Sequence, residues 1–293
     1  MSATQRDVFW QAVTARALHD ERIVVVTADM SAPALDDFRR RFPHRYINTG
    51  VAEQAAVLTA AGLALAGLRP FCYAIQPFAG LRALEPWKCA VVLHALPVVL
   101  VGVGAGLGIA DSGPTHHAIG DLGAMLAIPG TEVLCPSSRV LTEAAAAHCL
   151  GTHGPVYVRL DQAADLPEPP EPKPGAIRSG VIVHRGHPTR MVITSGALVS
   201  EALTLEDTGV IEVWRFPFDP GAISENIRGT YVVVWEETTG ALYDQLCRAF
   251  TTWYARGLYS IRAHNYSYQY GGRAQIRKSM GIDLEEVKRC LTE

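Results

Sequence analysis

The sequence predicts an α/β protein of two domains, each with a mainly parallel sheet flanked by helices. Its 293 residues, 48% hydrophobic and 19% charged, are enough for about two domains with buried cores. Short β-branched runs, typical of strands buried on both faces, alternate with segments of helical character. A proline-rich stretch divides the chain into two parts of ordinary domain size.

Residues 1–165 form the first predicted domain, where strands and helices alternate and should give a parallel sheet. The expected elements, in order, are a helix at 6–20, a strand at 23–27, a helix at 55–68, a strand at 70–75, a helix at 78–94 and a strand at 97–103. The clearest is the strand at 23–27, since Ile23-Val-Val-Val-Thr27 is an unbroken β-branched run.

Residues 166–175 form the predicted linker, because the five prolines of this stretch remove backbone donors and favour an extended path. The second predicted domain, residues 176–293, repeats the alternation. Its strands are expected at 191–194, 210–213 and 231–235. Its last helix should begin at Asp283, which can cap it while Glu286 reaches back in a capping box.

Composition excludes several classes of function. A formal net charge of −3 offers no general attraction to nucleic acid. Apolar runs are too short or too glycine-broken to span a membrane, which needs about 20 residues. The first residues lack the basic and apolar regions of a signal peptide, so we expect a cytoplasmic protein. Six cysteines without Cys-x-x-Cys spacing predict neither a disulfide framework nor a zinc site.

Glu53 is the most informative single residue. It lies in Asn48-Thr-Gly-Val-Ala-Glu-Gln-Ala-Ala-Val57 and opens the apolar helix that follows. A carboxylate there either caps loose backbone amides or is kept for chemistry in a poorly solvated place. Taken alone, the residue favours capping.

Three ordered segments change that interpretation. The Glu53 segment resembles the glutamate segment of the thiamine-diphosphate enzymes of the transketolase family. Ile75-Gln-Pro-Phe-Ala-Gly-Leu-Arg-Ala-Leu-Glu85 is similar to that family's aromatic cofactor-stacking stretch, and Gly113-Pro-Thr-His-His117 to its Gly-Pro-Thr-His segment. The resemblance covers nearly the whole chain and implies the pyrimidine-binding and carboxyl-terminal domains of the family, with thiamine diphosphate as cofactor.

The resemblance assigns three residues to the cofactor's aminopyrimidine ring. Glu53 matches the glutamate that hydrogen-bonds a ring nitrogen, and burial in general raises the proton affinity that lets a carboxyl group share a proton with a weak base. Phe78 matches the aromatic residue that stacks on the ring, although core packing would also explain it. Arg82 stands at the family spacing as a cofactor-binding candidate, but it and Glu85 could equally form a surface ion pair.

The resemblance places three further residues at the same site. Asp29 matches an aspartate that faces the cofactor pocket from the carboxyl end of a strand, with helix capping an equal alternative. His116 matches a catalytic and substrate-binding histidine near the substrate oxygen, where an imidazole can donate or shuttle a proton. His117, where the family often has glutamine, is a weaker substrate-binding candidate.

The family's diphosphate-binding module is marked by Gly-Asp-Gly, which does not occur in this chain. The resemblance therefore implies a second subunit that carries the diphosphate-binding domain and holds the diphosphate through Mg²⁺. The active site should form at the contact between the two chains, so that this chain alone is inactive. Twofold symmetry then favours a heterotetramer.

Substrate-facing positions depart from those of sugar-phosphate transketolases. Ser112 stands where the family has an acidic residue, for which Asp111 can substitute, and Gln162 stands where an arginine is expected. Arg159 remains as an anion contact. The loss of phosphate-binding cations puts a phosphorylated acceptor in doubt.

The sequence thus predicts the pyrimidine-binding subunit of a split transketolase-like enzyme that transfers a two-carbon ketol unit from a ketose donor to an acceptor. One alternative is the beta subunit of a thiamine-dependent 2-oxo acid dehydrogenase or an acyloin synthase. Another is a non-catalytic partner subunit. The Gly-Pro-Thr-His segment favours ketol transfer, and the presence of Glu53, Phe78 and His116 argues against a silent partner.

Overall fold

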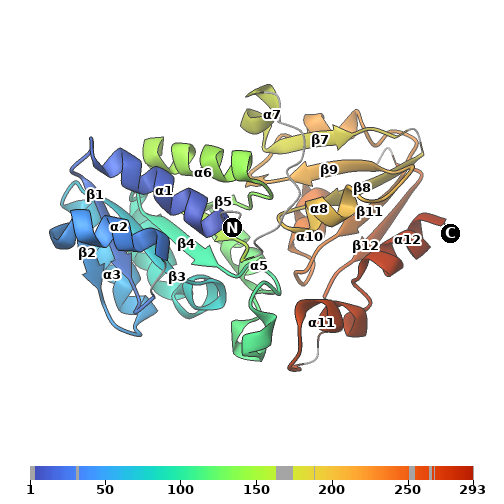
Figure 1. The fold of residues 1–293 in the computed structure, drawn as a ribbon. Helices are drawn as coiled ribbons and strands as arrows, with labels where there is room; N and C mark the ends of the chain where they lie inside the picture. Colours follow the sequence, from blue (N-terminus) through green and yellow to red (C-terminus); the bar gives the residue numbers. More distant parts are fainter. Residues whose placement is uncertain are drawn as a thin grey trace.

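The computed structural model describes residues 4–30, 33–162, 174–187, 189–250, 255–263, 266 and 268–292. Within them the chain forms one seven-stranded and one five-stranded sheet, side by side and flanked by helices (Figure 1). Both sheets are mainly parallel, so the predicted α/β class is confirmed. Among the same residues, no helix has the length and apolar character needed to cross a membrane.

The first sheet has the strand order β10-β5-β6-β4-β3-β1-β2. Its strands are β1 (Ile23–Thr27), β2 (Tyr46–Asn48), β3 (Arg69–Ile75), β4 (Val99–Val103), β5 (Glu132–Leu134), β6 (Val156–Leu160) and β10 (Arg215–Phe216). All neighbouring pairs in this sheet are parallel except β10 with β5. The carboxyl ends of the parallel strands therefore meet at one edge, where ligands of open α/β sheets usually bind.

Helices cover both faces of this sheet. The helices α1 (Gln5–Ala17) and α6 (Arg139–Gly151) pack on one face, and α3 (Glu53–Leu65) packs on the other (Figure 1). Successive strand residues point to opposite faces, so Val25 packs in the core with α1 and Val26 in the core with α3. This two-sided burial explains why the strands consist of continuous apolar runs.

The second sheet has the order β12-β11-β8-β9-β7, with only β7 antiparallel to its neighbour among the described strands. Its strands are β7 (Val181–Arg185), β8 (Arg190–Thr194), β9 (Gly209–Val213), β11 (Tyr231–Trp235) and β12 (Gly257–Ile261). The other helices are α2 (Pro33–Arg41), α5 (Asp121–Leu126), α7 (Pro174–Ser179), α8 (Leu198–Ala202), α9 (Gly221–Ser224), α10 (Ala241–Ala249), α11 (Arg273–Met280) and α12 (Leu284–Thr292).

The segment predicted as one helix at 78–94 is irregular. Two π-helical turns, η2 (Phe78–Arg82) and η3 (Trp87–Val91), flank the short α4 (Leu84–Pro86), and the 3₁₀ turn η4 (Val92–His94) ends the segment. Pro86 supplies no N–H to the helical ladder, which favours a break here. The segment thus keeps its helical path, but with wider turns at both π elements.

The last helix follows the predicted capping only in part. The Asp283 carboxylate accepts a hydrogen bond from the backbone N–H of Glu286 at 3.0 Å, as expected of a cap. Glu286 does not reach back, because its carboxylate accepts from Arg289 Nε at 3.0 Å. An ion pair one helical turn away thus replaces the second half of the capping box.

The division of the chain is less simple than the linker predicts. Strand β10 comes from the second part of the sequence, yet it pairs with β5 and extends the first sheet. Residues 166–173 of the predicted linker lie outside the described residues, and its last two residues begin α7. Domains at 1–165 and 176–293 remain a prediction.

Candidate active site

The turn before Glu53 is fixed by Asn48 at the end of β2. The Asn48 Oδ1 atom accepts from the backbone N–H groups of Asp29 at 2.9 Å and Gly50 at 3.0 Å. Its Nδ2 atom donates to Asp29 Oδ1 at 3.0 Å. Asp29 is exposed, has a left-handed φ of 54°, and makes these contacts with Asn48 rather than with Glu53. The predicted cofactor residue Asp29 therefore holds the turn that leads into α3.

Glu53 is the first residue of α3, and its side chain is only 5% exposed. Arg82 Nη1 donates to Glu53 Oε2 at 2.7 Å, while the guanidinium carbon of Arg82 lies 4.1 Å from the centroid of the Phe78 ring. The His116 ring stands edge-on to the same phenyl ring, with centroids 5.1 Å apart and planes at 70°. Four of the residues predicted from three separate motifs thus lie in one cluster.

Phe78 and Arg82 are the first and last residues of η2. Residues four apart in a helical turn lie on one face, which lets the Arg82 guanidinium lie over the Phe78 ring. Gln54 Nε2 donates to the backbone carbonyl of Arg82 at 3.1 Å and ties η2 to α3. Arg82 therefore pairs with Glu53 across the fold rather than with its neighbour Glu85.

His116 lies at the end of the 3₁₀ turn η6 (Pro114–His116), half-buried, with its Nδ1 atom 2.9 Å from Thr115 Oγ1. Partial burial, and then the positive potentials of His117 and Arg82, lower the pKa of His116 below its ordinary value of 6.5. A neutral imidazole near neutral pH can accept a proton or donate one from its N–H. Such a group suits proton transfer at a substrate oxygen.

The other predicted residues of this loop have different surroundings. His117 is buried, and both ring nitrogens are engaged: Nε2 with the Ala110 carbonyl at 3.2 Å, and Nδ1 with the Tyr266 hydroxyl. His117 therefore ties this loop to itself at Ala110 and to the second half of the chain at Tyr266. Asp111 is exposed in the short turn η5 (Ala110–Ser112), on the same loop as His116.

Arg159 is held in a buried ion pair beneath the histidine loop. Its Nε and Nη2 atoms donate to the two carboxylate oxygens of Asp121 at 2.8 and 3.0 Å, and Nη2 also donates to the Ala118 carbonyl at 3.2 Å. Burial alone would lower the pKa of Arg159, but the Asp121 carboxylate outweighs it and raises that pKa above its usual range. Arg159 bonds to Asp121 and the Ala118 carbonyl rather than to His116, so the predicted anion contact acts here as a support for the loop.

Three residues of that support, Gln76, Asp121 and Tyr157, were not singled out from the sequence. Gln76 Nε2 donates to Asp121 Oδ2 at 3.0 Å and to the Tyr157 hydroxyl at 2.6 Å, and the Tyr157 hydroxyl donates to Asp121 Oδ2 at 2.9 Å. Gln76, two residues before Phe78, is fully buried. The available signal was a glutamine and an aspartate inside otherwise apolar segments, since buried polar groups need partners.

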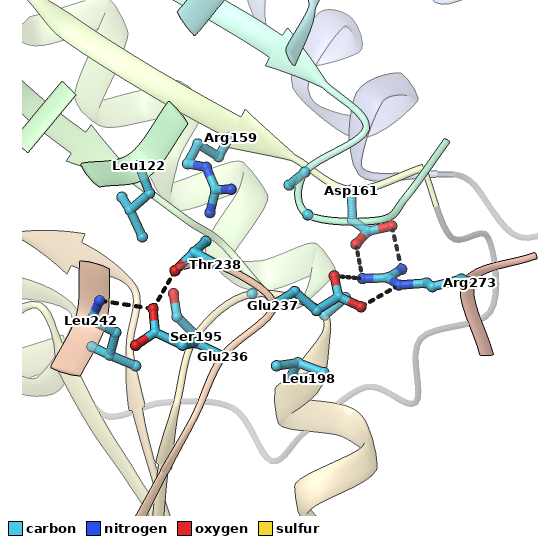
Figure 2. Close-up of a pocket in the computed structure, with 14 residues that line it drawn as sticks. Leu122, Arg159, Asp161, Ser195, Leu198, Glu236, Glu237, Thr238, Leu242 and Arg273 are labelled. Carbon is cyan, nitrogen blue, oxygen red and sulfur yellow. Dashed lines mark hydrogen bonds and ion pairs between the residues drawn. The ribbon is translucent and has the colours of Figure 1, made fainter. Parts of the chain in front are cut away.

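A second network of charged side chains lies between the two sheets, around the pocket drawn in Figure 2. Arg273 Nη2 donates to Asp161 Oδ2 at 2.9 Å and to Glu237 Oε2 at 2.7 Å, joining the end of β6 to the end of β11. Glu53, Phe78 and His116 do not line this pocket, whereas Arg159 does. No sequence motif indicates this network, because its members are far apart along the chain.

The described residues contain no group of three or more His, Cys, Asp or Glu side chains placed to hold a metal ion. The six cysteines are free thiols. The cluster itself consists of the Glu53 carboxylate, the Arg82 guanidinium, the Phe78 ring and the His116 imidazole.

Comparison with known proteins decides the family. The model of the transketolase pyrimidine-binding domain matches residues 2–164, more than half of the chain. The chain belongs to the transketolase family.

Several curated relatives align with most of this chain. The 1-deoxy-D-xylulose-5-phosphate synthase 2 of Geobacter sulfurreducens is 30% identical over 96% of the chain, which spans 47% of that relative. The 6-deoxy-6-sulfo-D-fructose transketolase subunit SqwH of a Clostridium species is also 30% identical, over 81% of the chain and 76% of its own length. The chain thus spans about half the length of the synthase relatives it matches.

Solved structures show the same fold. A split-gene transketolase, described as an inactive beta4 tetramer, has a TM-score of 0.82 at 24% identity and covers 100% of this chain and 98% of its own. Transketolase from Leishmania mexicana has a TM-score of 0.80 at 21% identity, with 100% of this chain matching 45% of that one. At these identities the likeness concerns the fold alone.

The transketolase family depends on thiamine diphosphate, and the cluster fits the aminopyrimidine end of that cofactor. A planar nitrogen group, the Arg82 guanidinium, already lies over the Phe78 ring while bonded to Glu53. A flat nitrogen heterocycle can make the same two contacts, one through its face and one through a ring nitrogen.

Proposed function

We propose that this chain is the pyrimidine-binding subunit of a split thiamine-diphosphate-dependent enzyme that transfers a two-carbon ketol unit from a ketose donor to an acceptor. The observation that carries the proposal is the convergence of the Glu53 carboxylate and the Phe78 ring on one planar nitrogen group, with His116 at the edge of the same ring. Family membership supplies the reaction class.

In this proposal each residue has a distinct role. When bound, thiamine diphosphate supplies a carbon nucleophile and then accepts the electron pair of the broken carbon–carbon bond. Phe78 orients the aminopyrimidine by stacking, and Glu53 shares a proton with its ring nitrogen in a poorly solvated place. His116 exchanges a proton with the substrate oxygen. Asp29 positions the turn before Glu53, while Asp111 and His117 lie on the loop proposed to face the substrate.

We also propose that a second subunit completes the site by holding the diphosphate through Mg²⁺. Two subunits of each kind would then form a heterotetramer. Three findings support this. The chain spans 47% of its synthase relative, the sulfofructose enzyme relative is named as a subunit, and the similar solved structure is of a split-gene transketolase. A cytoplasmic location is proposed with it.

A second candidate is an acyloin-type synthase. The observation that favours it is the name of several relatives, whose product is a 1-deoxy sugar phosphate. A 1-deoxyketose ends in CH₃–CO, whereas a ketol unit ends in HOCH₂–CO. The two candidates therefore differ in the donor that delivers the two-carbon unit.

The test begins with the partner. The chain is purified with the protein that co-purifies with it, and the pair is assayed with thiamine diphosphate, Mg²⁺ and either ketose or 2-oxo acid donors. We expect ketol transfer only from the pair and only with the cofactor. Consumption of a 2-oxo acid with release of carbon dioxide would instead establish the synthase candidate.

Glu53→Gln tests the catalytic assignment. It keeps the size of the side chain but removes the carboxylate, so we expect turnover to fall by about 100-fold or more while sedimentation shows an intact complex. Glu85→Gln, an exposed position in α4, is the matched control and should retain wild-type turnover. Unchanged turnover in Glu53→Gln would contradict the proposed role.

A further inference from the structure

Arg82 occupies the place that the proposed function gives to the cofactor's ring. Its guanidinium is hydrogen-bonded to Glu53 Oε2 at 2.7 Å and lies over the face of Phe78 at 4.1 Å from the centroid. A flat heterocycle that stacks on Phe78 while bonded to Glu53 needs the same volume, because a single planar group already makes both contacts. The arginine and the heterocycle therefore exclude each other.

The Arg82 side chain can leave this position without disturbing the fold. It is 45% exposed, whereas its partner Glu53 is 5% exposed, so a displaced guanidinium moves into water and regains hydration. Its backbone stays anchored, since the carbonyl accepts from Gln54 Nε2 at 3.1 Å. Displacement thus requires rotation of a long side chain and no movement of η2.

We propose that Arg82 is a displaceable internal occupant that closes the aminopyrimidine site in the free chain and swings out when the cofactor enters. This inference rests on the proposed function for the identity of the entering ring. It reverses the role that the motif assigns to Arg82, since the arginine competes with the ring instead of contacting it in the same geometry.

Competition lowers the apparent affinity of the wild-type chain. The apparent affinity for an entering ring equals the affinity of the open site multiplied by the fraction of molecules in which Arg82 has left that site. An ion pair and a cation–π contact each change an equilibrium by a factor of a few when partly exposed. Removal of the guanidinium should therefore strengthen binding of an aminopyrimidine about 10-fold.

Two small probes test the proposal on the full chain. Methylguanidinium reproduces the missing arginine head group, and 4-amino-2-methylpyrimidine reproduces the cofactor ring without its diphosphate. Binding to the wild-type chain and to Arg82→Ala is followed by calorimetry and by the NMR signals of the Phe78 ring. Arg139→Ala, which removes an exposed arginine paired with Glu143, is the matched control.

The expected result has two parts. Methylguanidinium binds Arg82→Ala saturably, shifts the Phe78 signals, and binds neither the wild-type chain nor Arg139→Ala. The aminopyrimidine binds Arg82→Ala about 10-fold more tightly than the wild-type chain, and methylguanidinium competes with it. Circular dichroism verifies that the variants are folded.

The outcomes separate the two claims. Absence of methylguanidinium binding to Arg82→Ala, or weaker aminopyrimidine binding by that variant, overturns the inference that Arg82 closes the site. If methylguanidinium binds Arg82→Ala at Phe78 but the aminopyrimidine binds neither chain, Arg82 still occupies the site and the proposed cofactor role of the site fails instead.

Discussion

At the scale of single residues, the candidate site depends on the partner that each charged side chain finds. Arg82 had two acidic candidates, the nearby Glu85 and the distant Glu53, and it pairs with the buried one. Ionic contacts are stronger where water is excluded, so a carboxylate that is 5% exposed is the better partner. Partial burial, and then the charges of His117 and Arg82, lower the pKa of the neighbouring His116.

The lowered pKa of His116 predicts how stability depends on pH. Below the ordinary value of 6.5, the unfolded chain takes up a proton at this position more readily than the folded chain does. Stability is therefore present above about pH 6.5 and is lost as the pH falls toward the folded pKa. We expect urea midpoints to fall more steeply from about pH 7.5 to 5.5 for the wild-type chain than for His116→Gln.

The exposed His94 provides the control for this experiment. His94→Gln should keep the slope of the wild-type chain, because it leaves His116 and its neighbours in place. Parallel midpoints for the wild-type chain and His116→Gln would show that the surroundings of His116 do not oppose its protonation.

At the scale of elements, β4 packs so closely against the residue after β3 that position 102 requires glycine. A Cβ atom at Gly102 would collide with the side-chain amide of Gln76, which hydrogen-bonds Asp121 and Tyr157. That polar network supports the loop of His116 and the turn of Phe78. The geometry of the site is thus coupled to the packing of the sheet.

Gly102→Ala tests this coupling. We expect a loss of about 1–3 kcal/mol in the free energy of unfolding, because the network must shift to admit one methyl group. Gly62→Ala, in the middle of α3 with no atom within 4 Å of the added Cβ, is the contrasting variant. It should gain roughly 0.5–1 kcal/mol from reduced backbone entropy in the unfolded chain and better helix propensity. Urea unfolding measures both, and equal effects would refute the steric argument.

At the scale of the whole molecule, the two sheets are joined by buried charge. Arg273 bridges Asp161 and Glu237, and Glu237 also accepts a hydrogen bond from the backbone N–H of Leu107 at 3.1 Å. Burial alone would raise the pKa of Glu237, but Arg273 and Arg277 outweigh it and lower that pKa to about 2. The loop that carries His116 leaves the first sheet at this junction.

Glu237→Gln should therefore destabilise the protein by ~3 kcal/mol at neutral pH, because it removes one of two carboxylates from both Arg273 and the buried Arg277, which keep only Asp161 and Glu201. The contribution of Glu237 is present above its ordinary pKa of 4.5 and is lost as the pH falls toward about 2. The difference between the wild-type chain and the variant should accordingly shrink in acid. Glu285→Gln, whose surface partner is Lys288, should change stability by less than about 0.5 kcal/mol. A small effect of Glu237→Gln at neutral pH would contradict this account.

Elements with a local signal could be predicted from the residues alone. Two strands have their predicted bounds, Ile23–Thr27 and Tyr231–Trp235, because a continuous β-branched run can be recognised without knowing its partners in the sheet. The motif spacing also brought Glu53, Phe78, Arg82 and His116 to attention, and these four residues lie together. The short strands β5 and β10 carried no comparable local signal.

Contacts between residues far apart along the chain could not be predicted without the fold. Arg82 and Glu53 are 29 residues apart, and Arg273 and Asp161 are 112 apart. Burial selects such pairs, because a charge removed from water requires a partner wherever the fold brings one. The sequence thus supplied the side chains of the site, and the packing of two sheets assigned Arg82 to Glu53, Arg159 to Asp121 and His117 to Tyr266.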